Sequence, residues 1–152
     1  MTSGTSDRTF VDTNVLIYAH DVDAGRKHEI AKDLLRTLWA DRAGILSTQV
    51  LQEFYVNATR KIRKPLTKPE ARSVVDTYAS WCVEGIVTGD IVAAFQLEDQ
   101  ARIGFWDALT VAVAARGGAR RIASEDLNDG QSIAGILIHN PFEERPQARP
   151  RR

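Results

Sequence analysis

The stretch from Thr9 to Asp21 passes directly from a short apolar run into a helical one, and this transition constrains the fold more than any other feature. Thr9–Val11 favours a buried strand, because Phe and Val side chains suit a covered, pleated surface. Residues 12–14 are polar and can satisfy the free N–H groups of a starting helix, which we expect over residues 15–19. An acid at such a junction lies at the carboxyl edge of a sheet, where open α/β folds bind their ligands. Asp12 is therefore either a simple helix cap or part of a site.

Strands and helices alternate along the rest of the chain. Apolar runs and helical spacing predict strands at residues 44–46, 83–87, 121–124 and 135–139, and helices at residues 25–39, 49–61, 67–80, 91–102 and 106–116. The alternation predicts an α/β domain whose mostly parallel sheet is covered by helices on both faces. We expect this domain to occupy residues 9–142, between a flexible segment at residues 1–8 and a charged tail at residues 143–152.

The composition bears on which partners the protein can attract and on where in the cell it is expected. Lys plus Arg and Asp plus Glu balance at 20 each in 152 residues, so net charge provides no general attraction to polyanions. No apolar run is long enough to cross a bilayer, and the first residues lack the apolar centre of a signal peptide, so no membrane association is expected. The single cysteine, Cys82, lies between Trp81 and Val83 and is expected to be a core thiol. A cytoplasmic location fits these features.

Basic residues are unevenly distributed along the chain. A central basic group consists of Arg60, Lys61, Arg63, Lys64 and Lys68, and a C-terminal basic group consists of Arg145, Arg149, Arg151 and Arg152. Either group can be an ordinary solvated surface, and either can contact the phosphates of a nucleic acid. We take the central basic group as a candidate RNA-binding surface.

Four acids occur at comparable points of the predicted fold. They are Asp12 at the end of the first strand, Glu53 on the helix after the second, Asp107 in the first turn of the alanine-rich helix, and Asp126 after the strand at residues 121–124. Taken singly, each can cap a helix, complement a helix dipole, lie on the surface or shape a turn. Together at one sheet edge, their carboxylates would repel one another unless a cation sat among them. Such oxygen ligands suit Mg²⁺ or Mn²⁺, which can support phosphodiester hydrolysis.

These acids lie in segments that resemble the acidic motifs of the PIN domain family, and particularly those of the VapC-type toxin ribonucleases. The segments are Phe10–Leu16, Gln52–Phe54, Phe105–Leu109 and Ser124–Gly130, in the order of the family and within a match from Arg8 to Phe142. The resemblance implies a three-layer α/β/α sandwich and an endoribonuclease that depends on Mg²⁺ or Mn²⁺. It also implies an RNA substrate, a homodimer, and an antitoxin protein that blocks the acidic site.

The resemblance also implies a role for each matching residue of this sequence. It assigns metal binding and catalysis to Asp12, Glu53, Asp107 and Asp126. Asn14 and Ser124 become supporting polar groups. Asp129 can reach the same site in place of Asp126. We prefer Asp126 because the period of two along the chain puts it on the side of Ser124, with Glu125 opposite.

Two other functions remain open on the sequence. An α/β phosphatase would use Asp12 as a nucleophile, but it usually has a second Asp two residues further on, where this chain has Asn14. A degenerate PIN-like scaffold would bind RNA or a partner without catalysis, and such a domain normally lacks one of the acids. The three tryptophans are expected in the core, although Trp106 is also a candidate for base stacking because it adjoins Asp107.

Overall fold

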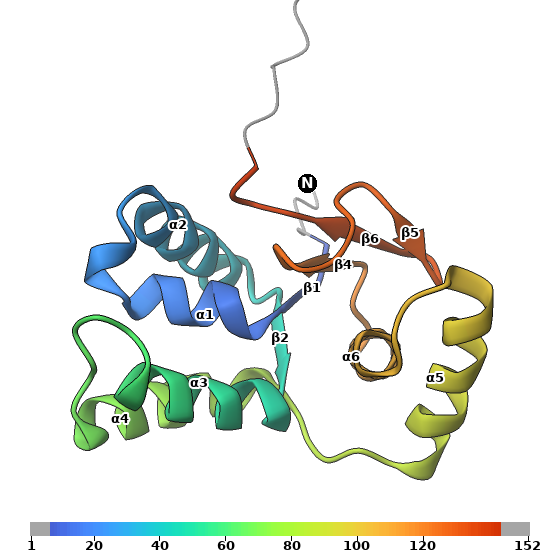
Figure 1. Ribbon diagram of the computed structural model, residues 1–152, viewed down its shortest axis with the longest axis horizontal. Coiled ribbons are helices and arrows are strands. Elements are labelled where there is room, and N and C mark those ends of the chain that lie inside the picture. Colours follow the sequence, from blue (N-terminus) through green and yellow to red (C-terminus); the bar gives the residue numbers. More distant parts are fainter. Residues whose placement is uncertain (1–6, 144–152) are drawn as a thin grey trace, which may run out of the picture.

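A six-stranded sheet forms the centre of the computed structural model, which describes residues 7–143 (Figure 1). Its spatial order is β3-β2-β1-β4-β6-β5, and neighbouring strands are parallel except for β5 with β6. The strands are β1 Thr9–Val11, β2 Gly44–Ser47, β3 Cys82–Val83, β4 Arg121–Ala123, β5 Ser132–Ile133 and β6 Ile136–His139. The predicted mostly parallel sheet is confirmed. The segment and tail predicted at the two ends lie almost entirely outside the described residues.

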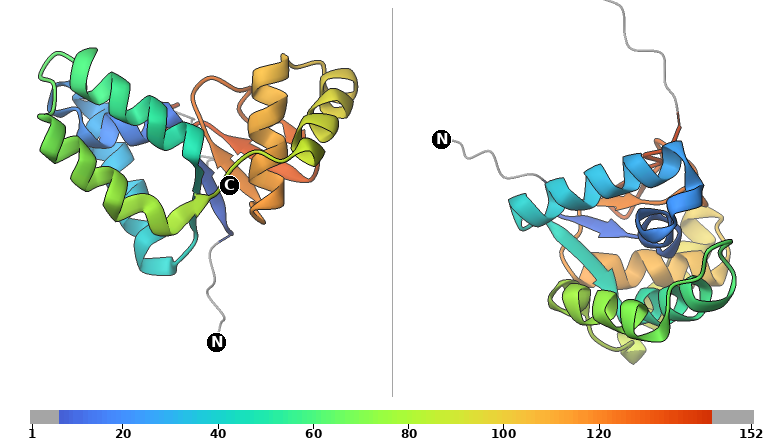
Figure 2. Two further views of the ribbon diagram at one scale, coloured as in Figure 1. Left: turned by 90° about the horizontal axis from the view of Figure 1, so that it is seen from below. Right: turned by 90° about the vertical axis from the view of Figure 1, so that its left-hand side faces the viewer.

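Helices cover the sheet on both sides. In Figures 1 and 2, α1 to α4 lie on one side of the strands and α5 with α6 on the other, which confirms the predicted layers. The helices are α1 Thr13–His20, α2 Arg26–Asp41, α3 Thr48–Arg60, α4 Lys68–Tyr78, α5 Thr88–Ala101 and α6 Phe105–Arg116, with short 3-10 helices η1 Val22–Ala24 and η2 Ala79–Trp81. No helix within residues 7–143 is long and apolar enough to span a membrane.

Helix starts follow the capping residues of the sequence. Ser47 closes β2, and its hydroxyl accepts a hydrogen bond from a backbone N–H in the first turn of α3. At the start of α4, Thr67 and Glu70 form a capping box in which each side chain accepts from the backbone N–H of the other. At the start of α5, the Asp90 carboxylate accepts a hydrogen bond from the Val87 N–H, so this helix is capped by a residue of its own first turn.

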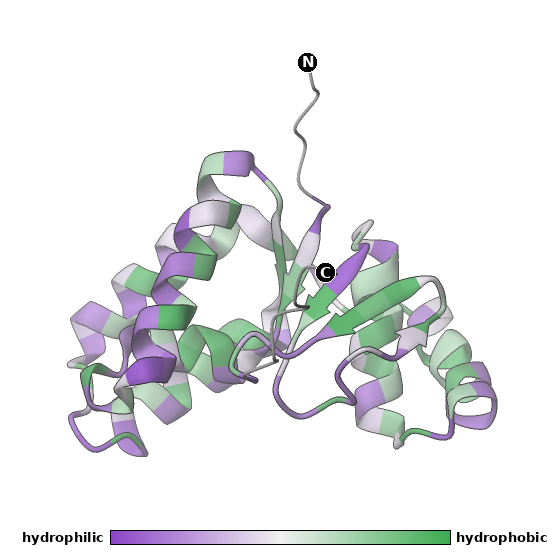
Figure 3. Ribbon diagram, turned by 90° about the horizontal axis from the view of Figure 1, so that it is seen from above, coloured by the Kyte–Doolittle hydropathy of each residue, from purple (hydrophilic) through white to green (hydrophobic). Residues whose placement is uncertain are grey.

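The hydrophobic core lies along the central strands. Phe10, Ile45, Ile122 and Ile138 are almost completely buried there. Figure 3 shows the apolar colour concentrated on these strands and on α6. Most of the α6 circumference is covered, because residues 108, 109 and 111–114 are all buried. This packed layer provides the rigid edge on which the polar residues after each strand are held.

Two expectations about the strands are wrong. The strand expected at residues 83–87 is reduced to the two residues of β3, because the chain leaves the sheet after Val83 and Gly85 takes a positive φ of 68°. β5 is absent from the predicted strands. It pairs with β6 through a two-residue turn in which Ala134 and Gly135 both have positive φ, at 53° and 78°. Alanine rarely takes this conformation, so the local sequence signals the turn weakly.

The tryptophans divide between core and surface, contrary to the expectation that all three are core residues. Trp81 is half-buried and covers Gly44, where a Cβ atom would lie 2.5 Å from its ring. Trp39 and Trp106 are 46% and 70% exposed. Cys82 is half-buried, and burial raises the pKa of its thiol, which fits a structural cysteine rather than a nucleophile.

Candidate functional site

Strand register places Asp12 beside Ser124. β1 and β4 pair in parallel with Val11 opposite Ala123, so the residues that follow meet at the carboxyl edge of the sheet. The buried Ser124 hydroxyl donates a hydrogen bond to Asp12 Oδ2 at 2.7 Å, and the Thr13 N–H donates to Asp12 Oδ1 at 2.8 Å. Asp12 is thus the N-cap of α1 and also a member of a side-chain cluster.

Glu53 joins this cluster from α3. The Thr13 hydroxyl, in the first turn of α1, donates a hydrogen bond to Glu53 Oε1 at 2.6 Å. The side-chain amide of Gln49 donates to Glu53 Oε2 at 3.3 Å. Because α3 begins directly after β2, which lies next to β1, this carboxylate reaches the same sheet edge as Asp12.

Asp126 reaches the cluster from the loop after β4. Its backbone N–H donates to the Ser124 hydroxyl at 3.1 Å, and its Oδ2 accepts from the Asn14 amide at 3.0 Å. The neighbouring Glu125 points the other way and pairs with Lys27 at 2.8 Å, as the period of two predicts. Asp126, and not Glu125, therefore faces the other acids.

Asp129, the alternative fourth acid, contacts a different element. Its Oδ1 accepts a hydrogen bond from the Asn140 N–H at 2.9 Å, which ties the loop to the residue after β6. This contact gives Asp129 a structural role, whereas Asp126 is bonded to the first turn of α1.

The acids influence one another's ionisation. Burial raises the pKa of Asp12, its hydrogen bonds oppose the rise, and the charges of Asp126 and Glu53 add to it. Asp107 lies in the first turn of α6, and its pKa is also raised, first by partial desolvation and then by the charge of Asp126. Asp126 is thus the common neighbour through which Asp107 joins the cluster.

The donor set at this edge fits a hard divalent cation. No Lys, Arg or His within residues 7–143 forms an ion pair with any of the four acids. As the side chains stand, no three His, Cys, Asp or Glu in that part of the chain come close enough together to hold a metal ion. The donors are all oxygens, however, and Asn14 Oδ1 beside them is buried without a hydrogen-bond partner. Mg²⁺ keeps several waters and often takes one or two carboxylates, so it needs no closed protein cage.

The central basic group lies at the far end of α3 from the sheet edge (Figure 1). Arg60 ends α3 about 10 Å further along the helix axis than Glu53, at 1.5 Å per residue. In the loop that follows, the Lys64 Nζ lies 4.0 Å from the Asp23 carboxylate of η1. These cations therefore lie too far from the four acids to form ion pairs with them. The C-terminal basic group lies outside the described residues.

An aromatic surface borders the site beside Asp107. Trp106 is 70% exposed and meets Phe105 edge-on, with 5.1 Å between ring centroids. Phe105 in turn lies 5.9 Å from the exposed ring of Phe95 on α5. Helical periodicity could not predict this surface, because nearly the whole of α6 is apolar in sequence. The available signal was the position of Trp106 next to an acid in the first turn.

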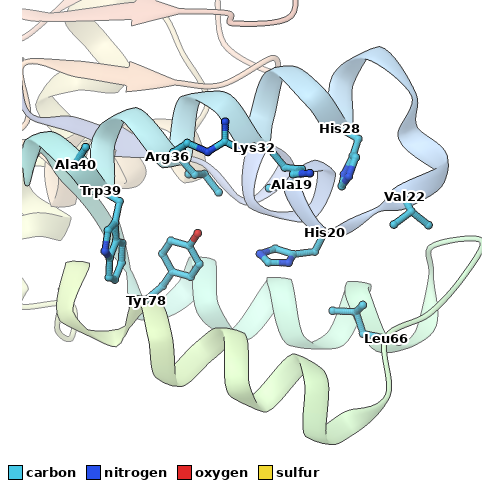
Figure 4. Close-up of a pocket in the computed structure, with 11 residues that line it drawn as sticks. Ala19, His20, Val22, His28, Lys32, Arg36, Trp39, Ala40, Leu66 and Tyr78 are labelled. Atoms are coloured by element: carbon cyan, nitrogen blue, oxygen red, sulfur yellow. The ribbon is translucent and has the colours of Figure 1, made fainter.

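A groove of about 750 Å³ lies away from the four acids, between α2 and α4 (Figure 4). Trp39 of α2 and Tyr78 of α4 meet edge-on at one end of it, with 5.6 Å between ring centroids. Its lining also includes the apolar Leu66 and the basic Lys32 and Arg36. This mixture suits an amphipathic segment better than a small polar substrate.

The comparison with known families agrees with this geometry. The model of the PIN domain matches residues 9–129. The chain therefore belongs to the PIN domain family, as its acidic segments indicate. No curated protein matches the chain at a significant level.

Solved structures with a similar fold include toxin–antitoxin proteins. One is a toxin–antitoxin complex from Klebsiella pneumoniae, at 21% identity and a TM-score of 0.61, over 90% of this chain and 99% of that chain. Another is VapC20 of Mycobacterium tuberculosis, a toxin that cleaves the sarcin-ricin loop, at 19% identity and a TM-score of 0.53, over 75% and 86%. A third is VapBC2 of Rickettsia felis bound to a DNA fragment from its promoter, at 18% identity and a TM-score of 0.60, over 87% and 97%. At these identities the likeness establishes the fold.

Proposed function

We propose that this protein is a metal-dependent endoribonuclease that hydrolyses RNA phosphodiester bonds in the cytoplasm, as the toxin of a toxin–antitoxin pair. The observation that carries the proposal is the electrostatic coupling of four acids from separate elements near one sheet edge, with the pKa of two of them raised and no ion pair from residues 7–143. Neighbouring carboxylates without a positive charge repel one another and oppose folding. Their presence at one edge therefore favours a site in which a divalent cation supplies that charge.

The geometry supports a role for each residue in this proposal. Asp12, Glu53, Asp107 and Asp126 would hold one or two Mg²⁺ or Mn²⁺ ions. Such an ion lowers the pKa of a bound water and stabilises the leaving oxygen in phosphodiester hydrolysis. The side chains of Ser124, Thr13 and Asn14 each hold one of these carboxylates by a hydrogen bond, so the ligands are oriented in advance.

Cleavage of single-stranded RNA by the purified chain tests this proposal. We expect cleavage with Mg²⁺ or Mn²⁺, loss of cleavage with EDTA, and recovery when Mn²⁺ is restored in excess. Asp12→Asn protein purified in the same way controls for contaminating nucleases. Full cleavage in excess chelator would contradict a metal-dependent mechanism.

The exposed Trp106 supports single-stranded RNA as the substrate class. An aromatic face beside the reacting phosphate can stack on an unpaired base of any sequence. We expect Trp106→Ala to weaken RNA binding about tenfold, within the range of one lost stacking contact. Trp39→Ala is the matched control, because Trp39 is also exposed but lies in the groove of Figure 4. Equal effects of the two substitutions would remove this role from Trp106.

The groove of Figure 4 supports an antitoxin as the protein partner. Its aromatic and basic lining suits an amphipathic segment that carries acidic side chains, and the similar solved structures include toxin–antitoxin complexes. We expect Tyr78→Glu to abolish co-purification with an antitoxin encoded beside this chain, while RNA cleavage by the isolated variant persists. Retained co-purification would place the antitoxin elsewhere.

Exposed apolar residues on α5 support the expected homodimer. Val92 and Phe95 are 50% and 52% exposed and lie on one side of the helix. A second copy of the chain would cover them. Light scattering after size exclusion should show a dimer for the wild type and a monomer for Val92→Glu, and a monomeric wild type would contradict this part of the proposal.

The alternative functions differ in what the same assays would show. An aspartyl phosphatase is less well supported, because both carboxylate oxygens of Asp12 already accept hydrogen bonds and Asn14 is bonded to Asp126. A non-catalytic PIN scaffold would bind RNA without cleaving it at any Mg²⁺ or Mn²⁺ concentration. Binding without cleavage would therefore favour the scaffold.

A further inference from the structure

Asp126 differs from the other three acids because its backbone lies in a loop. Asp12 caps α1, while Glu53 and Asp107 lie within α3 and α6. Asp126 belongs to residues 124–131, which connect β4 to β5 without regular structure. Ordering a loop residue costs conformational entropy, so a ligand in such a position needs its neighbours to hold it.

The residue before Asp126 provides such an attachment. The Tyr18 hydroxyl of α1 donates to Glu125 Oε1 at 2.5 Å, and the Lys27 ammonium of α2 donates to Glu125 Oε2 at 2.8 Å. Both oxygens of Glu125 are therefore held by the helical layer. Lys27 Nζ also lies 4.9 Å from the ring centroid of Tyr18 and 5.7 Å from that of Phe142, so the cation lies near two rings that meet each other edge-on.

Helix electrostatics strengthen the Glu125 contact. Lys27 lies in the first turn of α2, where the helix dipole disfavours a cation and favours an anion. The Glu125 carboxylate neutralises the Lys27 cation and also places a negative charge near the start of α2. Its hydrogen bond raises the pKa of Lys27, while burial and then the same carboxylate raise the pKa of Tyr18. Both donors therefore keep their protons at neutral pH.

The other side of Asp126 is also held. Asp129 accepts from the Asn140 N–H at 2.9 Å, and the Gly130 N–H donates to the Ile138 carbonyl at 2.9 Å. The loop is thus attached to β6 after Asp126 and to the helical layer before it. Two contacts hold it toward α1 and α2, the Asn14 amide on Asp126 Oδ2 and the pair of donors on Glu125.

We propose that Lys27 and Tyr18 are positioning residues of the acidic site, which hold Glu125 and thereby present Asp126 to the metal. This inference rests on the proposed metal-dependent function. Neither residue touches the metal or the substrate in this role. An isolated, partly exposed salt bridge contributes little to stability, whereas outer contacts that orient a metal ligand commonly change metal affinity.

Calorimetric titration of the metal-free full chain with Mn²⁺ tests the role directly. We expect Lys27→Met to weaken Mn²⁺ binding about tenfold, the lower end for lost outer contacts of a metal site. Tyr18→Phe, which keeps the ring but loses the hydroxyl, should weaken it less, and Lys27→Arg should restore it. The matched control is Arg121→Met, which breaks a partly exposed pair with Asp7 at the start of β4, away from the acidic edge, and should leave Mn²⁺ binding unchanged.

A double-mutant cycle separates positioning from general destabilisation. When Asp126 is already replaced in Asp126→Asn, adding Lys27→Met should weaken Mn²⁺ binding no further, because there is no charged ligand left to position. Full additivity would overturn the inference, as would unchanged Mn²⁺ affinity in both Lys27→Met and Tyr18→Phe. If Lys27→Met fails to fold, Tyr18→Phe decides by the same measurements. A wild-type chain that binds no Mn²⁺ would instead refute the proposed function, and this inference with it.

Discussion

Asp90 and Asp12 are two acids at helix starts with opposite surroundings. Asp90 is 4% exposed, its carboxylate accepts from Arg116 Nε at 2.9 Å, and it caps α5 through the Val87 N–H at 3.0 Å. Asp12 caps α1 in a comparable way, but all of its hydrogen-bond donors are uncharged. The hydrogen bonds from Arg116 lower the pKa of Asp90 against the effect of burial, whereas burial and nearby acids raise the pKa of Asp12.

The difference teaches how a structural acid can be told from a candidate functional one. The negative charge of Asp90 is compensated within the fold, because the Arg116 guanidinium pairs with it. Arg116 also donates a hydrogen bond to the Gly85 carbonyl at 2.8 Å. The carboxylate of Asp12 has no such charge among residues 7–143. Folding alone explains the first arrangement, and a bound cation would explain the second.

The largest expected effect separates activity from stability at the acidic edge. Asp12→Asn and Asp107→Asn keep the side-chain shape and remove one charge each. We expect RNA cleavage to fall about 100-fold or more, because a metal ligand is lost and even outer contacts are worth 10- to 100-fold. The metal-free variants should melt at or above the temperature of the metal-free wild type, since repulsion is relieved.

Thermal melting with and without Mn²⁺, beside the cleavage assay, measures both quantities. Mn²⁺ at 100 times its dissociation constant should stabilise the wild type by about 2.7 kcal/mol and the variants much less. A variant that melts far below the metal-free wild type would show that its Asp is a structural cap. Normal cleavage in both variants would place the nuclease site elsewhere.

Asp90→Asn should have the reverse pattern. It removes charge-assisted hydrogen bonds to Arg116 and leaves the guanidinium without its counter-charge, so we expect a loss of about 1.5–3 kcal/mol in unfolding free energy. Urea denaturation measures this loss. RNA cleavage per folded molecule should stay at the wild-type level at low temperature, and a large loss of cleavage there would refute the assignment of Asp90 as purely structural.

The pH dependence of stability should have opposite signs in the two regions. The folded-state pKa of Asp90 is lowered, so its stabilising contribution is present above the unfolded value near 3.8 and is lost as the pH falls through the folded pKa. The folded-state pKa of Asp12 is raised, so its contribution is present below that unfolded value and is lost as the pH rises through the folded pKa.

Melting of the metal-free chain between about pH 3 and pH 7 checks both signs, since the carboxylates titrate in this range. The advantage of wild type over Asp90→Asn should shrink toward acid. The advantage of Asp12→Asn over wild type should appear only as the pH rises. The same sign for both substitutions would break the comparison.

The smallest expected effect concerns the central basic group. Replacing Arg60, Lys61 and Arg63 with Gln should weaken RNA binding modestly and reduce the salt slope by about 0.7 for each lost phosphate contact. Binding measured over a range of salt concentrations gives this slope. Gln at Lys32 and Arg36, which line the groove, is the control and should not change it. An unchanged slope would assign the central basic group to another partner or to solvent.

Much of the fold and the candidate site followed from short-range patterns. The Thr9–Val11 strand, the helix that follows β2 and the alternation of strands with helices could be predicted, because each depends on residues within one or two turns. The turn at Ala134 could not, because its positive φ contradicts local preference and depends on the pairing of β5 with β6. The exposure of Trp106 could not either, because an apolar helix does not reveal which end is left uncovered.

The sequence by itself determined which carboxylates stand at the ends of strands and starts of helices, since those positions are set by backbone hydrogen bonds and nearby caps. Only the tertiary structure decided their partners. Asp12 meets Ser124, 112 residues away, because β4 lies beside β1, and Asp90 meets Arg116 because α5 packs on α6. Charge compensation is a property of neighbours in space, and contacts over such separations depend on which elements pack together, which local periodicity does not encode.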